Sequence, residues 1–192
     1  MASLDADFNE LLERIRQGRE LNYAGFEPIY YLIFEPAAIL DVKRQVPIWK
    51  ARLKNQGWTA YQFSMAEQIL DIWRQTHAPI RKIWTKADAQ APHNWARSNT
   101  ALSNALANGA LQERLEHQLA DIDGQAQTIL LVTDLEALHP YMRIGAVERQ
   151  LQGKFTVPTV FFYPGKRTGK TGLKFLGFHH QDGNYRSVHV GG

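Results

Sequence analysis

The sequence predicts an α/β protein with a mostly parallel sheet of about five strands and helices on both faces. Apolar runs at 29–34, 128–133 and 159–163 have the length of strands and lack polar alternation, which is typical of strands buried on both faces. Helical periodicity lies between these runs, as in chains that build a parallel sheet. With 192 residues, 44% of them hydrophobic, we expect one α/β domain over 1–192.

Two helices are predicted in the first part of the chain. Apolar side chains recur at helical spacing over 4–15, where Ser3 caps the start and Gly18 marks the expected end. A second helix is predicted over 37–55. Pro47 lies inside it and should kink or divide it, because proline lacks the amide hydrogen that a helix interior needs.

A short strand and a capped helix follow. The strand is predicted over 58–63. Ser64 and Glu67 then have the spacing of a capping box, in which each side chain accepts the other's free amide at a helix start. The stripe that we expect this helix to bury consists of Ile69, Leu70, Ile72 and Trp73.

A helical insertion is predicted at about 76–127, between two strands of the sheet, with helices near 98–107 and 109–121.

The last third of the chain returns to alternating strands and helices. Pro140 is expected to open a helix that runs to about Gln152, since proline is favoured in a first turn. Short strands are predicted at 173–176 and 185–190. Between them and the strand at 159–163, Pro164 and Gly165 predict a sharp turn.

Two segments resemble nucleotide-binding motifs only in part. Residues 165–171 read Gly-Lys-Arg-Thr-Gly-Lys-Thr, but the glycine spacing is one residue short of a phosphate loop, and a strand rather than a helix follows. We interpret them as a basic hairpin loop. Asp134 and Glu136 follow a buried strand, as a magnesium-binding aspartate does, but we interpret them as turn and helix-start residues.

Catalytic and metal-binding patterns are not apparent in the sequence. His179, His180 and His189 lack the spacing of a zinc site. There is no G-x-S-x-G elbow, and no carboxylate spacing assigns an acid and a base. We therefore expect no catalytic residue, no metal and no cofactor.

Charge is distributed unevenly along the chain. Residues 151–192 carry a balance of +5, so the first 150 residues sum to −2. A basic quarter of this kind could meet nucleic acid, a nucleotide or an acidic protein face, or be a solvated loop. Cysteine is absent, and neither a signal peptide nor a membrane-spanning run is visible. We expect a cytoplasmic protein.

The basic residues of this region alternate with aromatic ones, which suggests a binding surface. Basic side chains can neutralise phosphates and exposed aromatic rings can stack on bases, although Phe162 and Phe175 lie on predicted strands and are expected in the core. Arg186 could bond a carboxylate of the fold or of a partner. The candidate surface consists of Tyr163, Gly165, Lys166, Arg167, Lys170, Lys174, Tyr185 and Arg186.

The same region carries a family resemblance. The segments 130–143, 157–165, 173–177 and 182–186 together resemble the BrxB family, small proteins encoded beside an alkaline-phosphatase-like protein (PglZ) in BREX phage-defence islands. The Phe-Tyr-Pro-Gly and Asn-Tyr-Arg elements are its most specific parts. The family positions matched there, none with a known catalytic role, are Tyr163, Pro164, Gly165, Asn184, Tyr185 and Arg186.

The resemblance implies a non-catalytic component of a multi-protein complex that contacts the PglZ-like protein. One alternative is a nucleic-acid-binding subunit of the same system that uses the basic C-terminal region. Another is a degenerate nucleotide-binding fold without hydrolysis. The Lys-Arg-Thr-Gly-Lys-Thr loop at 166–171 departs from the family pattern.

Overall fold

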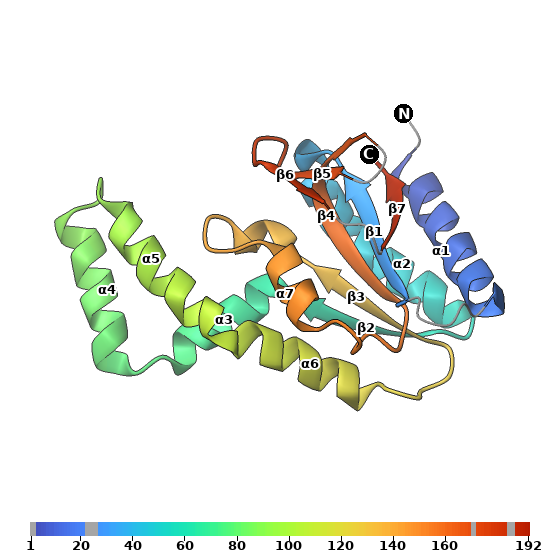
Figure 1. Cartoon of the computed structure of the whole chain (residues 1–192), viewed down its shortest axis with the longest axis horizontal. Coiled ribbons are helices and arrows are strands. Elements are labelled where there is room, and N and C mark those ends of the chain that lie inside the picture. The colour runs from blue at the N-terminus through green and yellow to red at the C-terminus, as the bar shows by residue number, and fades with distance from the viewer. Residues whose placement is uncertain (1–2, 22–26, 170–171, 184–186) are drawn as a thin grey trace.

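Five parallel strands form the centre of the fold, in the order β2-β3-β4-β1-β7 (Figure 1). The computed structural model describes residues 3–21, 27–169, 172–183 and 187–192. The order and direction of these five strands confirm the predicted, mostly parallel sheet of about five strands. The strands are β1 (Ile29–Phe34), β2 (Thr59–Ser64), β3 (Thr128–Thr133), β4 (Thr159–Thr168) and β7 (Val188–Gly191).

Both faces of the sheet are covered, and β1 shows how. All six of its residues are buried. Tyr30 and Leu32 face one apolar core, together with α1 (Leu4–Leu21) and α2 (Ile39–Asn55). Tyr31 belongs to a second core, on the opposite face, with residues of the later helices. The absence of polar alternation in this strand thus follows from its burial on two faces.

The first helix is capped as predicted but ends later than predicted. The Ala6 amide donates to Ser3 Oγ at 3.2 Å. The helix continues past Gly18 to Leu21. A Cβ atom on Gly18 would lie 2.7 Å from the Tyr30 hydroxyl oxygen, so this glycine permits close packing on the sheet instead of ending the helix.

The second helix, α2, is not divided at Pro47, which was one of the two effects predicted for this proline. A short 3-10 turn, Pro36–Ala38, precedes it, and the helix then runs unbroken to Asn55. Pro47 lies on the exposed side, where water can bond the carbonyl group that proline leaves unpaired. The opposite side is held to the core by Val42, Val46, Trp49 and Leu53.

Helix α3 (Met65–Gln75) begins at the predicted cap. The Glu67 amide donates to Ser64 Oγ at 3.3 Å. The predicted buried stripe is confirmed for Ile72, while Leu70 is 44% exposed. Ile69 packs half-buried against the same core and Trp73 is half-buried, so Leu70 is the one predicted stripe residue that is exposed.

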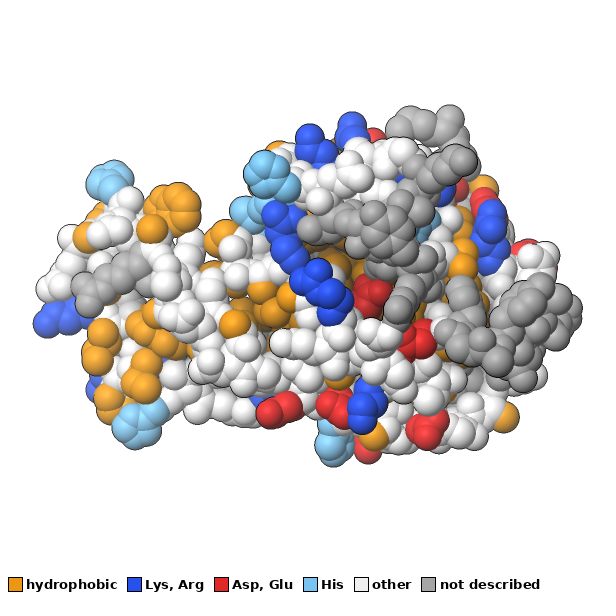
Figure 2. Space-filling view, viewed as in Figure 1, with side chains coloured by type: hydrophobic (Ala, Val, Ile, Leu, Met, Phe, Trp, Pro, Cys, Tyr) orange, Lys and Arg blue, Asp and Glu red, His pale blue; other side chains and the backbone are white. Residues whose placement is uncertain are grey.

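The predicted helical insertion is present and extends away from the sheet (Figure 1). It contains α4 (Ala78–Gln90), α5 (Trp95–Ala105), a π-helical turn (Leu106–Ala110) and α6 (Leu111–Asp121). Helix α6 buries Leu111, Leu115 and Leu119, whereas α4 buries no residue. We call residues 78–105 the α4–α5 arm. Figure 2 shows hydrophobic side chains gathered at the end of the molecule that this arm forms.

The helix predicted to open at Pro140 begins instead at Ile144. Between β3 and this helix, α7 (Ile144–Gln150), lies a 3-10 turn, Leu135–Leu138. The amides of Tyr141 and Met142 both donate to the Leu138 carbonyl, at 2.7 and 2.9 Å. The loop therefore satisfies its own amides, and the His139–Pro140 peptide within it is cis.

No sharp turn occurs at Pro164 and Gly165, and that prediction was wrong. Strand β4 continues through both residues but changes partner. Pro164 pairs with Phe34 in parallel, and Gly165 pairs with Phe175 in antiparallel. The predicted basic hairpin does follow, formed with β5 (Gly172–Phe175) and extended by β6 (Gln181–Gly183).

Within the described ranges, the structure contains no helix whose length and apolarity would let it cross a membrane.

Candidate functional site

Five of the eight predicted surface residues can be placed, while Lys170, Tyr185 and Arg186 lie outside the described residues. Tyr163 and Gly165 are buried. The Tyr163 ring packs against Tyr31 and Phe175, with ring centroids 5.6 and 5.4 Å away. Tyr163 is therefore part of the core and does not project from the surface.

The basic residues of the hairpin are divided between its two faces. Lys166 lies opposite Lys174 and forms an ion pair with Glu35 at 3.4 Å. Arg167 lies opposite Leu173, on the other face, because side chains alternate along a strand. The structure thus brings Lys166 and Lys174 together but separates Arg167 from them.

The aromatic side chains predicted for the core are confirmed there. Phe162 and Phe175 are 1% and 3% exposed. With Tyr163 also buried, these three rings do not form a platform on which nucleic-acid bases could stack.

A pocket of about 340 Å³ opens beside α7. Tyr31 and Tyr163 contribute from the sheet, and Leu173 from β5. The Tyr31 hydroxyl donates to the Glu148 carboxylate, and Arg143 and Arg149 also line the pocket. The pocket therefore combines aromatic side chains from the sheet with charged side chains from α7 and the residue preceding it.

Two of the histidines form a short chain of contacts beyond this pocket. An Arg143 guanidinium nitrogen lies 2.9 Å from His179 Nδ1, and His179 Nε2 lies 2.9 Å from His139 Nδ1. Because arginine only donates, His179 accepts at Nδ1 and donates from Nε2. His189 lies apart from them on β7, against the Tyr31 ring. Within the described residues, no three potential ligands gather around a metal position.

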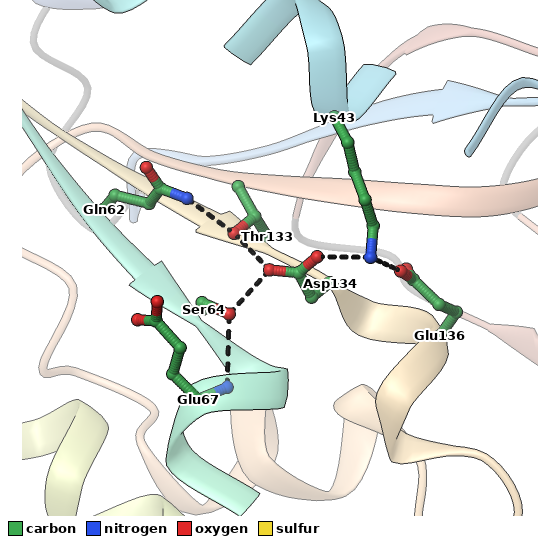
Figure 3. Close-up of polar contacts among 7 residues, drawn as sticks. All are labelled: Lys43, Gln62, Ser64, Glu67, Thr133, Asp134 and Glu136. Carbon is green, nitrogen blue, oxygen red and sulfur yellow. Dashed lines mark hydrogen bonds and ion pairs between the residues drawn. The ribbon is translucent and has the colours of Figure 1, made fainter. Parts of the chain in front are cut away.

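A polar cluster joins α2 to the carboxyl ends of β2 and β3 (Figure 3). Lys43 Nζ lies 2.8 Å from Asp134 Oδ1 and 2.7 Å from Glu136 Oε1. The second carboxylate oxygen of Asp134 accepts the Ser64 hydroxyl at 2.6 Å and the Thr133 hydroxyl at 3.0 Å. We call these five residues the Lys43–Asp134 cluster.

The cluster changes the acidity of Asp134. Burial would raise the pKa of this carboxyl, but hydrogen bonds from Lys43 and Ser64, the charge of Lys43 and the Thr133 hydroxyl outweigh burial. The pKa of Asp134 therefore lies below its usual value of 3.8. For Lys43, the same bonds to Asp134 and Glu136 outweigh burial and raise the pKa.

The arrangement of this cluster indicates a structural tie. Asp134 has a left-handed backbone, with φ of 61°, at the start of the 3-10 turn. This agrees with its interpretation as a turn residue. Its two oxygens bond three partners from α2, β2 and β3, which fixes the turn to both strands. Sequence reasoning missed Lys43, because nothing near it in the chain indicates that it meets Asp134.

Besides Leu70 of α3, which is exposed singly, the described helices expose large apolar side chains in two places. On α2, Leu40 and Ile48 are more than half exposed. On the α4–α5 arm, Ile80 is 43% exposed and both Ile83 and Trp95 are 61% exposed. Sequence reasoning left Trp95 unplaced and did not single out either patch, since an apolar residue at helical spacing usually indicates a core face.

The fold and these surfaces describe an α/β protein with a parallel sheet and a projecting, partly apolar helical arm. The family model described as BREX protein BrxB matches residues 61–190. The chain therefore belongs to the BrxB family and is a component of BREX phage defence. Neither the comparison with curated proteins nor the comparison with solved structures gave a match.

Proposed function

We propose that this chain is a non-catalytic, protein-binding component of its BREX system, and that it contacts the PglZ phosphatase-like protein encoded beside it. The observation that carries the proposal is the exposure of large apolar side chains on the helices, above all Ile80, Ile83 and Trp95. Single exposed apolar residues are ordinary, but several of them on two adjoining helices are typical of a surface that another protein covers.

The polar clusters support a non-catalytic role. Asp134 already bonds Lys43, Ser64 and Thr133, and a carboxylate held in this way, with a lowered pKa, is poorly suited to accept a proton near neutral pH.

A nucleic-acid-binding role receives less support from the basic C-terminal region. Lys154 and Lys166 form ion pairs with Glu116 and Glu35, at 3.0 and 3.4 Å. Each cation would have to leave a carboxylate to neutralise a phosphate. Together with the buried aromatic rings, this favours protein over nucleic acid as the partner.

The experiment is co-purification of the chain with its neighbouring PglZ-like protein at low and at high salt. We expect a complex that survives high salt, because contacts through apolar surface are screened little. Absence of a complex at both salt concentrations would exclude this partner. A steep loss of affinity for duplex DNA with rising salt, in the same preparation, would favour the nucleic-acid alternative.

A further inference from the structure

We infer that the α4–α5 arm is the element that docks on the protein partner, and that it binds an apolar groove rimmed by acidic side chains. This inference rests on the proposed protein-binding function and assigns its surface and the chemistry of the partner.

Helix α4 of the arm presents a short apolar ridge formed by Ile80 and Ile83. Ile80 and Ile83 are three residues apart on α4, so their side chains lie on the same side of the helix. Trp95 stands at the first position of α5, just after the loop that joins the two helices. All three are substantially exposed, and tryptophan is among the residues that contribute most to protein interfaces.

Helix α4 of the arm receives little support from the core. Helix α4 has 13 residues and buries none of them. Helices of about this length are marginally stable in water unless tertiary packing supports them. The neighbouring α6 receives that support through Leu111, Leu115 and Leu119. A partner that covers α4 would provide the apolar burial that the isolated chain does not.

The charge of the arm defines the partner's chemistry. Residues 78–105 contain four basic residues and one acidic residue, Asp88, for a net charge of +3, which equals the net charge of the whole chain. Lys82 and Lys86 are one helical turn apart and exposed. Arg81 lies over the Trp73 ring, 5.1 Å from its centroid. An acidic rim would complement this surface.

The aliphatic part of the ridge argues for a protein and against a nucleic acid. Ile80 and Ile83 offer neither charge nor an aromatic face to a phosphate or a base. Interfaces with nucleic acid are more polar and more basic than this. A groove on a protein would bury both isoleucines.

The other exposed apolar patch, on α2, differs from the arm in two ways: its helix has buried residues, and the charges beside it are balanced. Leu40 and Ile48 lie on α2, which is anchored by four buried residues. The charges beside Leu40 are balanced, since Arg44 forms an ion pair with Asp41 at 3.0 Å. Ile48 is 53% exposed, close to the value for Ile83, and therefore provides a matched control on the same molecule.

The apolar contact is tested with Ile83→Glu and Trp95→Ala against Ile48→Glu, each assayed for affinity to the purified PglZ-like protein. We expect the two arm variants to lose about tenfold or more in affinity and Ile48→Glu to bind like the unmodified chain. Equal Tm values for Ile83→Glu and Ile48→Glu would show that binding, not folding, is what differs. Equal affinities for these two variants would overturn the inference.

The acidic rim is tested with the double variant Lys82→Glu/Lys86→Glu, and with Lys82→Arg/Lys86→Arg as the control that keeps the charge. We expect the first to lower the association rate about tenfold at low salt, with a smaller effect at high salt, and the second to leave it unchanged. An unchanged association rate for Lys82→Glu/Lys86→Glu would overturn the inference that the partner's surface is acidic.

Four further outcomes identify a different error. If the unmodified chain binds the PglZ-like protein and no arm variant changes the affinity, the arm assignment fails while the proposed function stands. If the unmodified chain itself does not bind, the proposed function fails first. Self-association that is lost in Ile83→Glu, or binding to a 30-base-pair DNA duplex that is lost in the Lys82→Glu/Lys86→Glu variant, would replace the partner by a second copy or by DNA.

Discussion

Asp134 holds together three parts of the molecule that are far apart in the sequence. Lys43 reaches it from α2, and Ser64 from the end of β2. Ser64 also caps α3. Its hydroxyl group therefore accepts a hydrogen bond from the Glu67 amide and donates one to the Asp134 carboxylate. The cap was predictable, because Ser64 and Glu67 are neighbours in the chain. The ion pair was not, because it depends on how α2 packs on the sheet.

The substitution Asp134→Asn tests this cluster. Asparagine tolerates a left-handed backbone, so the variant mainly removes the charge. Because the pKa of Asp134 is lowered in the folded chain, its carboxylate stabilises the fold above the unfolded pKa, and this stabilisation is lost as pH falls through the folded pKa. We expect Asp134→Asn to cost about 1–2 kcal/mol at neutral pH and the difference to shrink at a pH below 3.8, as the pH falls through the lowered pKa of the folded chain.

Urea unfolding at the two pH values measures this difference. A deficit of the same size at both would contradict the electrostatic account of the cluster.

The substitution Gly165→Ala tests whether β4 continues through this residue and pairs closely with β5. A Cβ atom there would lie 2.4 Å from the Lys174 carbonyl oxygen across the hairpin. We expect Gly165→Ala to lower the free energy of unfolding by about 2 kcal/mol or more. The control is Gly145→Ala in α7, where nothing lies within 4 Å of the added atom and alanine is the better helix former.

Thermal unfolding of the two variants gives the comparison. Similar Tm values for Gly165→Ala and Gly145→Ala would show that the strands do not approach this closely.

Among the secondary-structure elements, the buried strands β1 and β3 were the most predictable and the start of α7 the least. Strands β1 and β3 are apolar throughout because both faces are covered, and that pattern is visible in the sequence alone. The start of α7 was misplaced because Tyr141 and Met142 bond the Leu138 carbonyl, and Pro140 is equally compatible with such a loop. The local preference of proline could not decide between a helix that starts at Pro140 and a loop that contains it.

The helices of the insertion should differ in local stability. Helix α4 buries no side chain, whereas α6 buries three leucines. We expect amide hydrogens of α4 to exchange at least about tenfold faster than those of α6, because little apolar contact opposes local opening. Hydrogen exchange followed by mass spectrometry measures both helices in one sample. Equal protection in the two would mean that the arm has support of its own and does not need a partner to cover it.

For the molecule as a whole, the class of fold was predictable and the surface was not. The alternation of strands and helices predicted the parallel sheet and the insertion, since buried patterns reflect the fold directly. Of the candidate surface, Tyr163 and Gly165 proved buried and Lys166 is paired with Glu35. The exposed ridge of the α4–α5 arm follows from how far the insertion projects, which depends on tertiary packing that helical spacing does not contain.

We propose that this BrxB-family chain works by protein contact. The most direct measurement is the affinity of the purified chain for the proposed partner, the PglZ-like protein of a BREX system, by titration calorimetry at about 0.1 and 0.5 M salt. We predict saturable binding that weakens by no more than about tenfold between the two, since apolar burial is little affected by screening. Absence of binding at both salt concentrations, with duplex DNA bound at the lower one, would contradict the claim.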